Sequence, residues 1–184
     1  MDRRDFVQSS AALLLAGCGY TEVDDMPQEF TLSPSPIRTG NQVNAMVPGY
    51  SEGLWTPQLS FGTNSVGITY GIQRGDWIKI GRSCLVNVLI VLTSKGSSTG
   101  AARIVTLPFK LPNVTGGAIS TVGSAAWFLM TSTLVNVTPI IQGNDERIEL
   151  FGLTVAGTEL IALTHADFSD TTDLNVSIFY RIGE

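Results

Sequence analysis

Apolar and polar side chains alternate along much of the chain from Trp55 onward, and residues 83–93 show the pattern most clearly. The residues that share one face of this extended segment are Cys84, Val86, Val88, Ile90 and Leu92. A second segment, 173–182, repeats the alternation. Further strands are expected at 66–73, 77–80, 101–107, 126–130, 134–141, 147–154 and 159–163, with Gly-, Ser- and Asn-containing turns between them. This spacing predicts an all-β fold, which we interpret as an antiparallel, jelly-roll-like β-sandwich.

The segment 83–93 also carries apolar residues on its second face, where Leu85, Leu89 and Val91 accompany Asn87. An antiparallel sheet usually leaves one face to solvent. Apolar residues on both faces therefore predict that this strand lies under a second layer or against another subunit.

Composition narrows the classes of partner. Of 184 residues, 15% are charged, the formal net charge is −5, and the eleven basic residues do not cluster. A nucleic-acid-binding surface needs a basic stripe that displaces counterions. We therefore expect no nucleic acid as a partner.

The first 53 residues differ from the rest. Residues 1–19 contain Arg3-Arg4, an apolar run and Leu15-Ala16-Gly17-Cys18, which together resemble a twin-arginine signal followed by a bacterial lipobox. In lipoproteins the equivalent of Cys18 carries the lipid. The alternative is an uncleaved segment that docks onto another protein. We expect three parts: a signal-like or docking segment at 1–19, an extended linker or arm at 20–53, and a β-sandwich module at 54–184.

No catalytic constellation stands out in the sequence. His165 is the single histidine, and it is expected to lie exposed on a helical turn at 164–168 that Thr164 caps. Residues 94–100 lack the order of a phosphate-binding loop, and the acidic residues near 145 lack the spacing of a calcium loop. We expect no enzyme active site, cofactor or metal. A carboxylate cluster at Asp167, Asp170 and Asp173 leaves glycan cleavage as a weaker hypothesis.

Several aromatic residues are candidates either for stacking on sugars or for packing in strands: Trp55, Tyr70, Trp77, Trp127 and Tyr180. Since Tyr70, Trp77 and Tyr180 fall inside expected strands, we assign them to packing. Trp127 stays undecided between the two roles.

Blocks of residues from 55 to 109, including Leu92-Thr-Ser-Lys-Gly-Ser-Ser-Thr-Gly100, and the segment 162–168 resemble the C-terminal module of bacteriophage tail-fibre and related virion proteins. The resemblance covers residues 54–184. It implies a β-sandwich, often trimeric, with roles in receptor binding or virion attachment, and it brings no catalytic residues.

The resulting hypothesis is a virion structural protein, namely a short tail fibre, spike or decoration subunit that contacts the host surface. Its expected partners are two further copies in a homotrimer, other virion proteins through residues 1–53, and a host surface glycan or protein. The candidate binding loop contains Lys95, Ser97, Ser98 and Thr99. The alternative is an outer-membrane lipoprotein that carries the same module and a lipid on Cys18.

Overall fold

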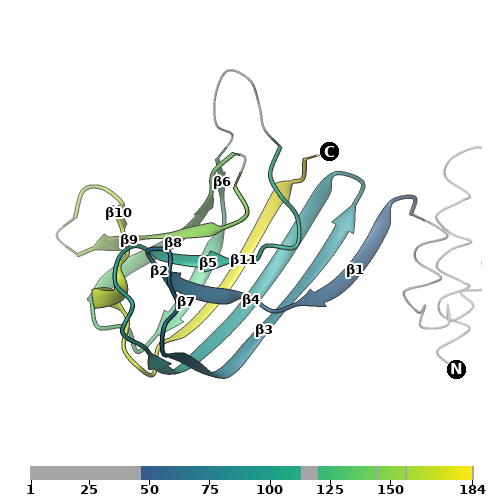
Figure 1. The fold of residues 1–184 in the computed structure, drawn as a ribbon. Helices are drawn as coiled ribbons and strands as arrows, with labels where there is room; N and C mark the ends of the chain where they lie inside the picture. The colour runs from purple at the N-terminus through teal and green to yellow at the C-terminus, as the bar shows by residue number, and fades with distance from the viewer. Residues whose placement is uncertain (1–46, 113–119, 144, 156, 184) are drawn as a thin grey trace, which may run out of the picture. The chain divides into compact units, whose positions relative to one another are not determined.

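The computed structural model describes residues 47–183, apart from 113–119, 144 and 156, and shows two antiparallel sheets that pack face to face (Figure 1). Sheet A contains, in spatial order, β1 (Tyr50–Trp55), β3 (Ile68–Ile80), β4 (Ser83–Lys95), β11 (Asp173–Arg181) and β7 (Ser124–Phe128). Sheet B contains β2 (Gln58–Phe61), β5 (Ala102–Val105), β9 (Ile148–Thr154), β8 (Leu134–Ile141) and β6 (Thr121–Val122), and β10 (Ile161–Ala162) pairs with β9. The predicted all-β antiparallel sandwich is confirmed.

The core lies between the two sheets and follows the predicted alternation. In β4 the side chains from Cys84 to Leu92 that share the inner face are at most 2% exposed. The inner face of β11 adds Leu174, Val176, Ile178 and Tyr180. Cys84 serves as a small apolar core residue, and its burial raises the pKa of the thiol. The predicted lipidation site, Cys18, lies outside the described residues.

The turn expected between the strands at 66–73 and 77–80 is wrong, because β3 runs through residues 74–76 as one strand of 13 residues. Gly75 pairs with Trp55 of β1, and a Cβ atom on Gly75 would lie 2.4 Å from the Trp55 indole nitrogen. Two residues along, Gly53 pairs with Trp77 and is covered by its indole in the same way. These glycines are therefore required by aromatic packing across the ladder, a known way of covering glycine in sheets.

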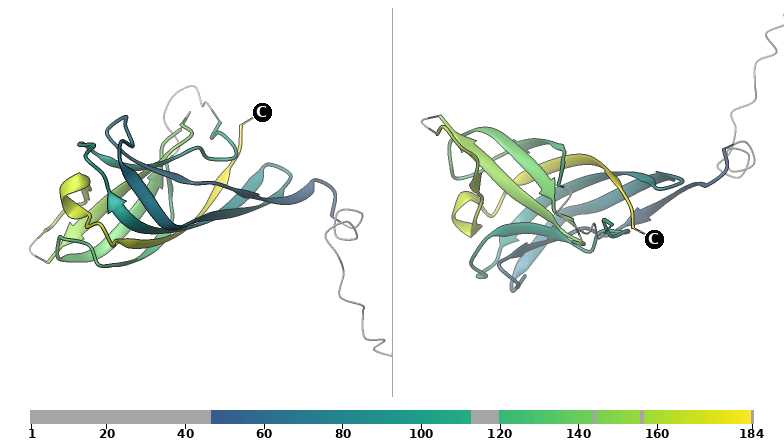
Figure 2. Two further views of the ribbon diagram at one scale, coloured as in Figure 1. Left: turned by 60° about the horizontal axis from the view of Figure 1, so that its bottom comes forward. Right: turned by 90° about the horizontal axis from the view of Figure 1, so that it is seen from above.

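Strand β1 begins at Tyr50, inside the segment expected to form the linker or arm. The chain crosses from sheet A to sheet B between β1 and β2, through Thr56-Pro57. It crosses between the sheets again at later points, one of them Gly123 between β6 and β7. At Gly123 a side chain would collide with the Ser177 carbonyl oxygen, at 2.5 Å. Figure 2 shows the two sheets from two further directions. None of the described segments forms an apolar helix of membrane-spanning length.

Candidate functional site: the loop end of the sandwich

Several loops meet at the end of the sandwich where β4 finishes, and we call this region the loop end. It comprises residues 62–67, 94–100, 129–133 and 163–172. Lys95 connects two of these segments, because its backbone N–H donates to Asp170 Oδ1 at 2.9 Å and its Nζ donates to the His165 carbonyl at 3.1 Å. The predicted binding loop is thus connected to the segment that contains two of the three candidate acids, Asp167 and Asp170.

The loop at 94–100 is also fixed to the turn before β3. Ser97 donates its N–H to the Val66 carbonyl at 3.0 Å, and Ser98 Oγ accepts the Val66 N–H at 2.8 Å. Gly96 has a φ of +70°, and a Cβ atom there would lie 2.2 Å from the Val66 carbonyl oxygen. Only glycine allows this close approach at that backbone conformation. These contacts therefore hold the backbone of the 94–100 loop in one conformation.

The helical turn predicted at 164–168 is confirmed as η1 (His165–Asp167), with Thr164 as its N-cap. The Thr164 hydroxyl accepts the Ala166 N–H, and the Asp167 carboxylate accepts the Thr164 N–H at 2.7 Å. This reciprocal arrangement is a capping box. Ser132 Oγ also donates to Asp167, which joins the loop at 129–133 to the turn.

The prediction that His165 is exposed is wrong, because its side chain is half-buried. Its Nδ1 accepts the Gly100 N–H at 3.2 Å, and its own backbone N–H donates to the Gly100 carbonyl at 3.1 Å. The imidazole also lies edge-on to the ring of Phe61, with 6.4 Å between ring centroids. The histidine thus holds the end of the 94–100 loop onto η1.

The structure gives structural roles to two of the three candidate acids. Asp167 accepts hydrogen bonds within η1 and from Ser132, and Asp170 accepts the Lys95 N–H. Asp173 opens β11 on the outer face of sheet A. Among the described residues, no group of three or more His, Cys, Asp or Glu side chains is arranged to hold a metal ion.

Solvent exposure divides the predicted binding loop into two kinds of residue. Lys95 and Ser98 are half-buried and make the contacts that hold the loop, whereas Ser97 and Thr99 are exposed. Two uncharged hydroxyls, each able to donate and to accept a hydrogen bond, therefore face solvent on a fixed backbone.

A neighbouring feature of the loop end was not expected from the sequence. Leu129 has a φ of +58°, is 67% exposed, and follows Phe128, which is 61% exposed. Hydrogen bonds from the hydroxyls of Ser169 and Thr172 to the Leu129 carbonyl hold this strained backbone. The apolar run 126–130 had predicted a strand up to Met130, and nothing in its residue types signals the left-handed turn.

The aromatic residues assigned to packing do pack against the core. Tyr180 is 1% exposed and donates its hydroxyl to the Phe109 carbonyl at 3.0 Å. Trp77 meets the Phe109 ring edge-on, and the Tyr70 hydroxyl accepts the Leu59 N–H at 3.0 Å. Trp127, which the sequence left undecided, is half-buried against the core as well.

Searches against protein-family models and against curated proteins found no match to the chain. Among solved structures, the fold is similar to that of the Dettilon tailspike protein (gp208), with a TM-score of 0.57 and 17% sequence identity. The similarity covers 73% of this chain and 24% of the tailspike chain. The chain therefore shares the fold of about a quarter of a phage tailspike.

Proposed function

We propose that the chain is a structural protein of a bacteriophage virion, a tail spike or short tail fibre subunit that acts as a homotrimer. Two independent observations support this function. The sandwich resembles part of a tailspike protein in fold. The amino-acid sequences of the segments 92–100 and 162–168 resemble those of tail-fibre modules.

The two ends of the sandwich differ in structure, which supports a different role for each end. The described chain begins beside the β3–β4 hairpin, where the Gly81 N–H donates to the Gly49 carbonyl at 3.0 Å. The loop end lies at the other end of β4, 13 residues along, which corresponds to about 40 Å. The described chain thus begins at the end opposite the loop end. We place attachment to the virion at that end and contact with the host at the loop end.

The exposed hydroxyls of the loop end suit a polar target. Ser97 and Thr99 carry no charge, and the hydrogen bonds around them fix the loop before binding. A preformed loop loses less conformational entropy when it binds. A host surface glycan, which is rich in hydroxyl groups, is the partner that fits this chemistry.

Mass spectrometry of purified phage particles made from the genome that encodes the chain tests the virion assignment. We expect peptides of the protein in the particles, and their absence would reject the assignment.

Binding of the purified protein to host cells tests the loop end. We expect Ser97→Asp and Thr99→Asp to lower cell binding at least tenfold. The control is Ser120→Asp, at an exposed position just before β6 at the opposite end, which should bind like the wild type. Equal loss in all three variants, or no loss in any, would reject contact through the loop end.

A further inference from the structure

The outer face of sheet A carries large apolar side chains that no described element covers. The exposed ones include Leu54 at 76%, Phe128 at 61%, Phe179 at 59% and Ile78 at 38%. Leu85, Leu89 and Val91 of the central strand β4 lie between them and are half-exposed. The second apolar face of 83–93 thus has no second layer in the described chain, which is unusual for a solvated sheet.

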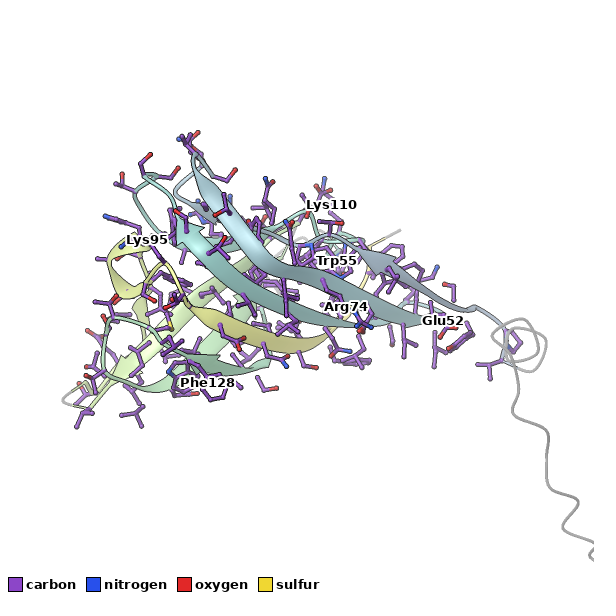
Figure 3. All side chains as sticks on the ribbon, turned by 90° about the horizontal axis from the view of Figure 1, so that it is seen from below. Glu52, Trp55, Arg74, Lys95, Lys110 and Phe128 are labelled. Carbon is purple, nitrogen blue, oxygen red and sulfur yellow. The ribbon has the colours of Figure 1, made fainter. Side chains whose placement is uncertain are left out.

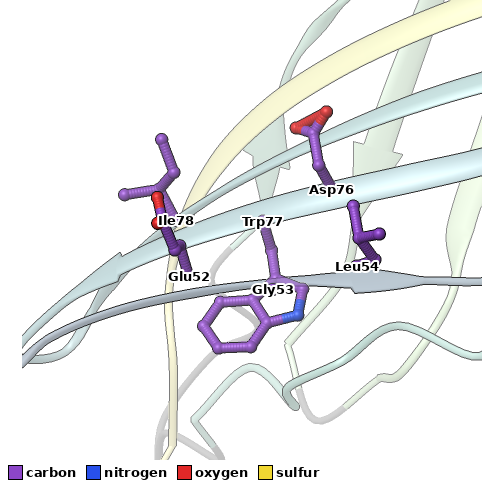
Figure 4. Close-up of a pocket in the computed structure, with 6 residues that line it drawn as sticks. All are labelled: Glu52, Gly53, Leu54, Asp76, Trp77 and Ile78. Carbon is purple, nitrogen blue, oxygen red and sulfur yellow. The ribbon is translucent and has the colours of Figure 1, made fainter. Parts of the chain in front are cut away.

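One margin of this face contains an apolar hollow of about 360 Å³ between β1 and β3 (Figure 4). The paired residues Gly53 and Trp77 lie at its floor. The walls are the outward side chains of Glu52, Leu54, Asp76 and Ile78. Because the Trp77 indole lies on the inner face, over Gly53, neither of these two residues places a side chain between the outward walls.

The opposite margin carries a protruding aromatic ring. Phe128 lies on β7, and β1 and β7 are the two edge strands of sheet A. Phe128 pairs with Asp173, which points outward, so its ring projects from the same face that contains the hollow. Figure 3 shows Phe128 and Glu52 at opposite margins of the sheet.

We propose that Phe128 of one copy occupies the Leu54–Ile78 hollow of the next copy. The two halves of this contact lie on different parts of one chain, so the contact is head-to-tail and can close into a ring. This inference rests on the homotrimer of the proposed function and assigns its contact surface. Size is compatible, since an apolar cavity of about 150 Å³ takes up benzene and this hollow measures about 360 Å³.

Charge favours a second copy as the occupant, and the area of the face sets the size of each contact. Five strands at a spacing of about 4.8 Å, with about ten residues each, give a face of roughly 600 Å². In a ring of three copies this face is shared between two neighbours, so each contact covers about half of it. That is less than the roughly 800 Å² that each partner contributes to a standard interface, and such a small contact depends strongly on its anchor residue, Phe128. The face is nearly balanced in charge, with Arg74 and Arg181 against Glu52, Asp76 and Asp173, in a chain of net charge −5. Two such faces avoid the repulsion that acidic surfaces would bring.

A polar centre would set the register of this contact. Asn87 donates to Asp76 Oδ2 at 2.8 Å in the middle of the face, and Arg74 and Asn175 line the same shallow depression of about 170 Å³. These polar groups must stay hydrated or paired when the face is covered. They disfavour sliding of one apolar face over another.

Analytical ultracentrifugation of the full-length protein tests the contact through two variants at opposite margins. Phe128→Lys removes the ring and Leu54→Lys charges the hollow, and both positions are exposed, which spares the fold. We expect the wild type to sediment as a trimer and each of the two variants to sediment as a monomer. The control is Val135→Lys, an apolar position on sheet B that is 57% exposed, and it should stay trimeric.

Mixing the two variants gives the sharper result. The first variant keeps an intact hollow and the second an intact ring, so an equimolar mixture should form a heterodimer that cannot grow further. Trimers of either variant alone, a mixture that stays monomeric, or a wild type of one or two chains would overturn the inference.

Thiol labelling of Asn175→Cys, with Val135→Cys as reference, tests the same face without charge changes. We expect labelling in the trimer to be at least tenfold slower at Asn175→Cys. Equal labelling rates at the two cysteines would overturn the inference. Slow labelling of Asn175→Cys in a monomeric protein would also overturn it, because residues 1–46 of the same chain would then be the segment that covers the face. The presence of the protein in virions is measured separately, so the proposed function and this contact can fail independently.

Discussion

The substitution Asp167→Ala tests whether this carboxylate is a structural part of the loop end. It removes the acceptor for the Thr164 N–H at 2.7 Å, the Thr164 hydroxyl at 3.1 Å and the Ser132 hydroxyl. The capping box of η1 and the connection to the loop at 129–133 are lost together. The three donors would then have to find water or stay unpaired.

The expected magnitude follows from these contacts. A hydrogen bond to a charged group contributes about 1.5–3 kcal/mol when its partners are buried. Since Asp167 is half-exposed, water replaces part of this contribution, and the lower end applies. The Thr164 cap on the Ala166 N–H stays in place, so the loss is that of the Asp167 contacts alone. We therefore expect the free energy of unfolding to fall by about 2–3 kcal/mol.

Urea denaturation followed by tryptophan fluorescence measures this change, because Trp55, Trp77 and Trp127 all pack against the core. The control is Asp173→Ala, since the Asp173 side chain makes no hydrogen bond or ion pair with a described residue. Its effect should stay within about 0.5 kcal/mol. An effect of Asp167→Ala equally small would refute the structural role and return Asp167 to the candidates for glycan cleavage.

Three further predictions concern the core and the signal-like segment at 1–19. Gly75→Ala should lower the free energy of unfolding by about 1–3 kcal/mol in the same assay, because a Cβ atom would lie 2.4 Å from the Trp55 indole nitrogen. The control is Gly71→Ala, where the nearest atom would lie at 3.4 Å, and it should change the free energy of unfolding by less than about 0.5 kcal/mol. Burial raises the pKa of Tyr180 strongly, so its contribution to stability is complete below the unfolded pKa of about 10 and is lost as the pH rises above it. Denaturation curves at rising alkaline pH should therefore show a smaller loss of stability for Tyr180→Phe than for the wild type, and equal losses would contradict this. The intact mass of the protein from virions should equal the full chain, whereas a lipidated mass of residues 18–184 would establish the lipoprotein.

The local sequence pattern was sufficient to predict a strand or a turn wherever one periodicity runs through the whole element. The alternation in 83–93 correctly predicted a central strand and the set of residues, from Cys84 to Leu92, that share one face of it. The pairing of Thr164 with Asp167 correctly predicted a capped turn, because capping needs only residues three apart in sequence. The strand at 134–141 was predicted with the bounds it has in the structure.

Contacts between distant segments could not be read from the chain in this way. Gly75 looked like a turn residue, since nothing around it shows that Trp55, on another strand, covers it. The roles of Lys95 and His165 depend on hydrogen bonds between loops about 70 residues apart. Leu129 adopts its left-handed backbone because Ser169 and Thr172 hold its carbonyl.

The sequence by itself determined the antiparallel β-architecture and which residues share a face of the long strands, because these depend on alternation. The tertiary structure decided which residues of the predicted binding loop face solvent. It also placed the aromatic ring of Phe128 and the Leu54–Ile78 hollow on one face of sheet A. Strand order and register set those positions, and they arise only when segments far apart in the chain pair with one another.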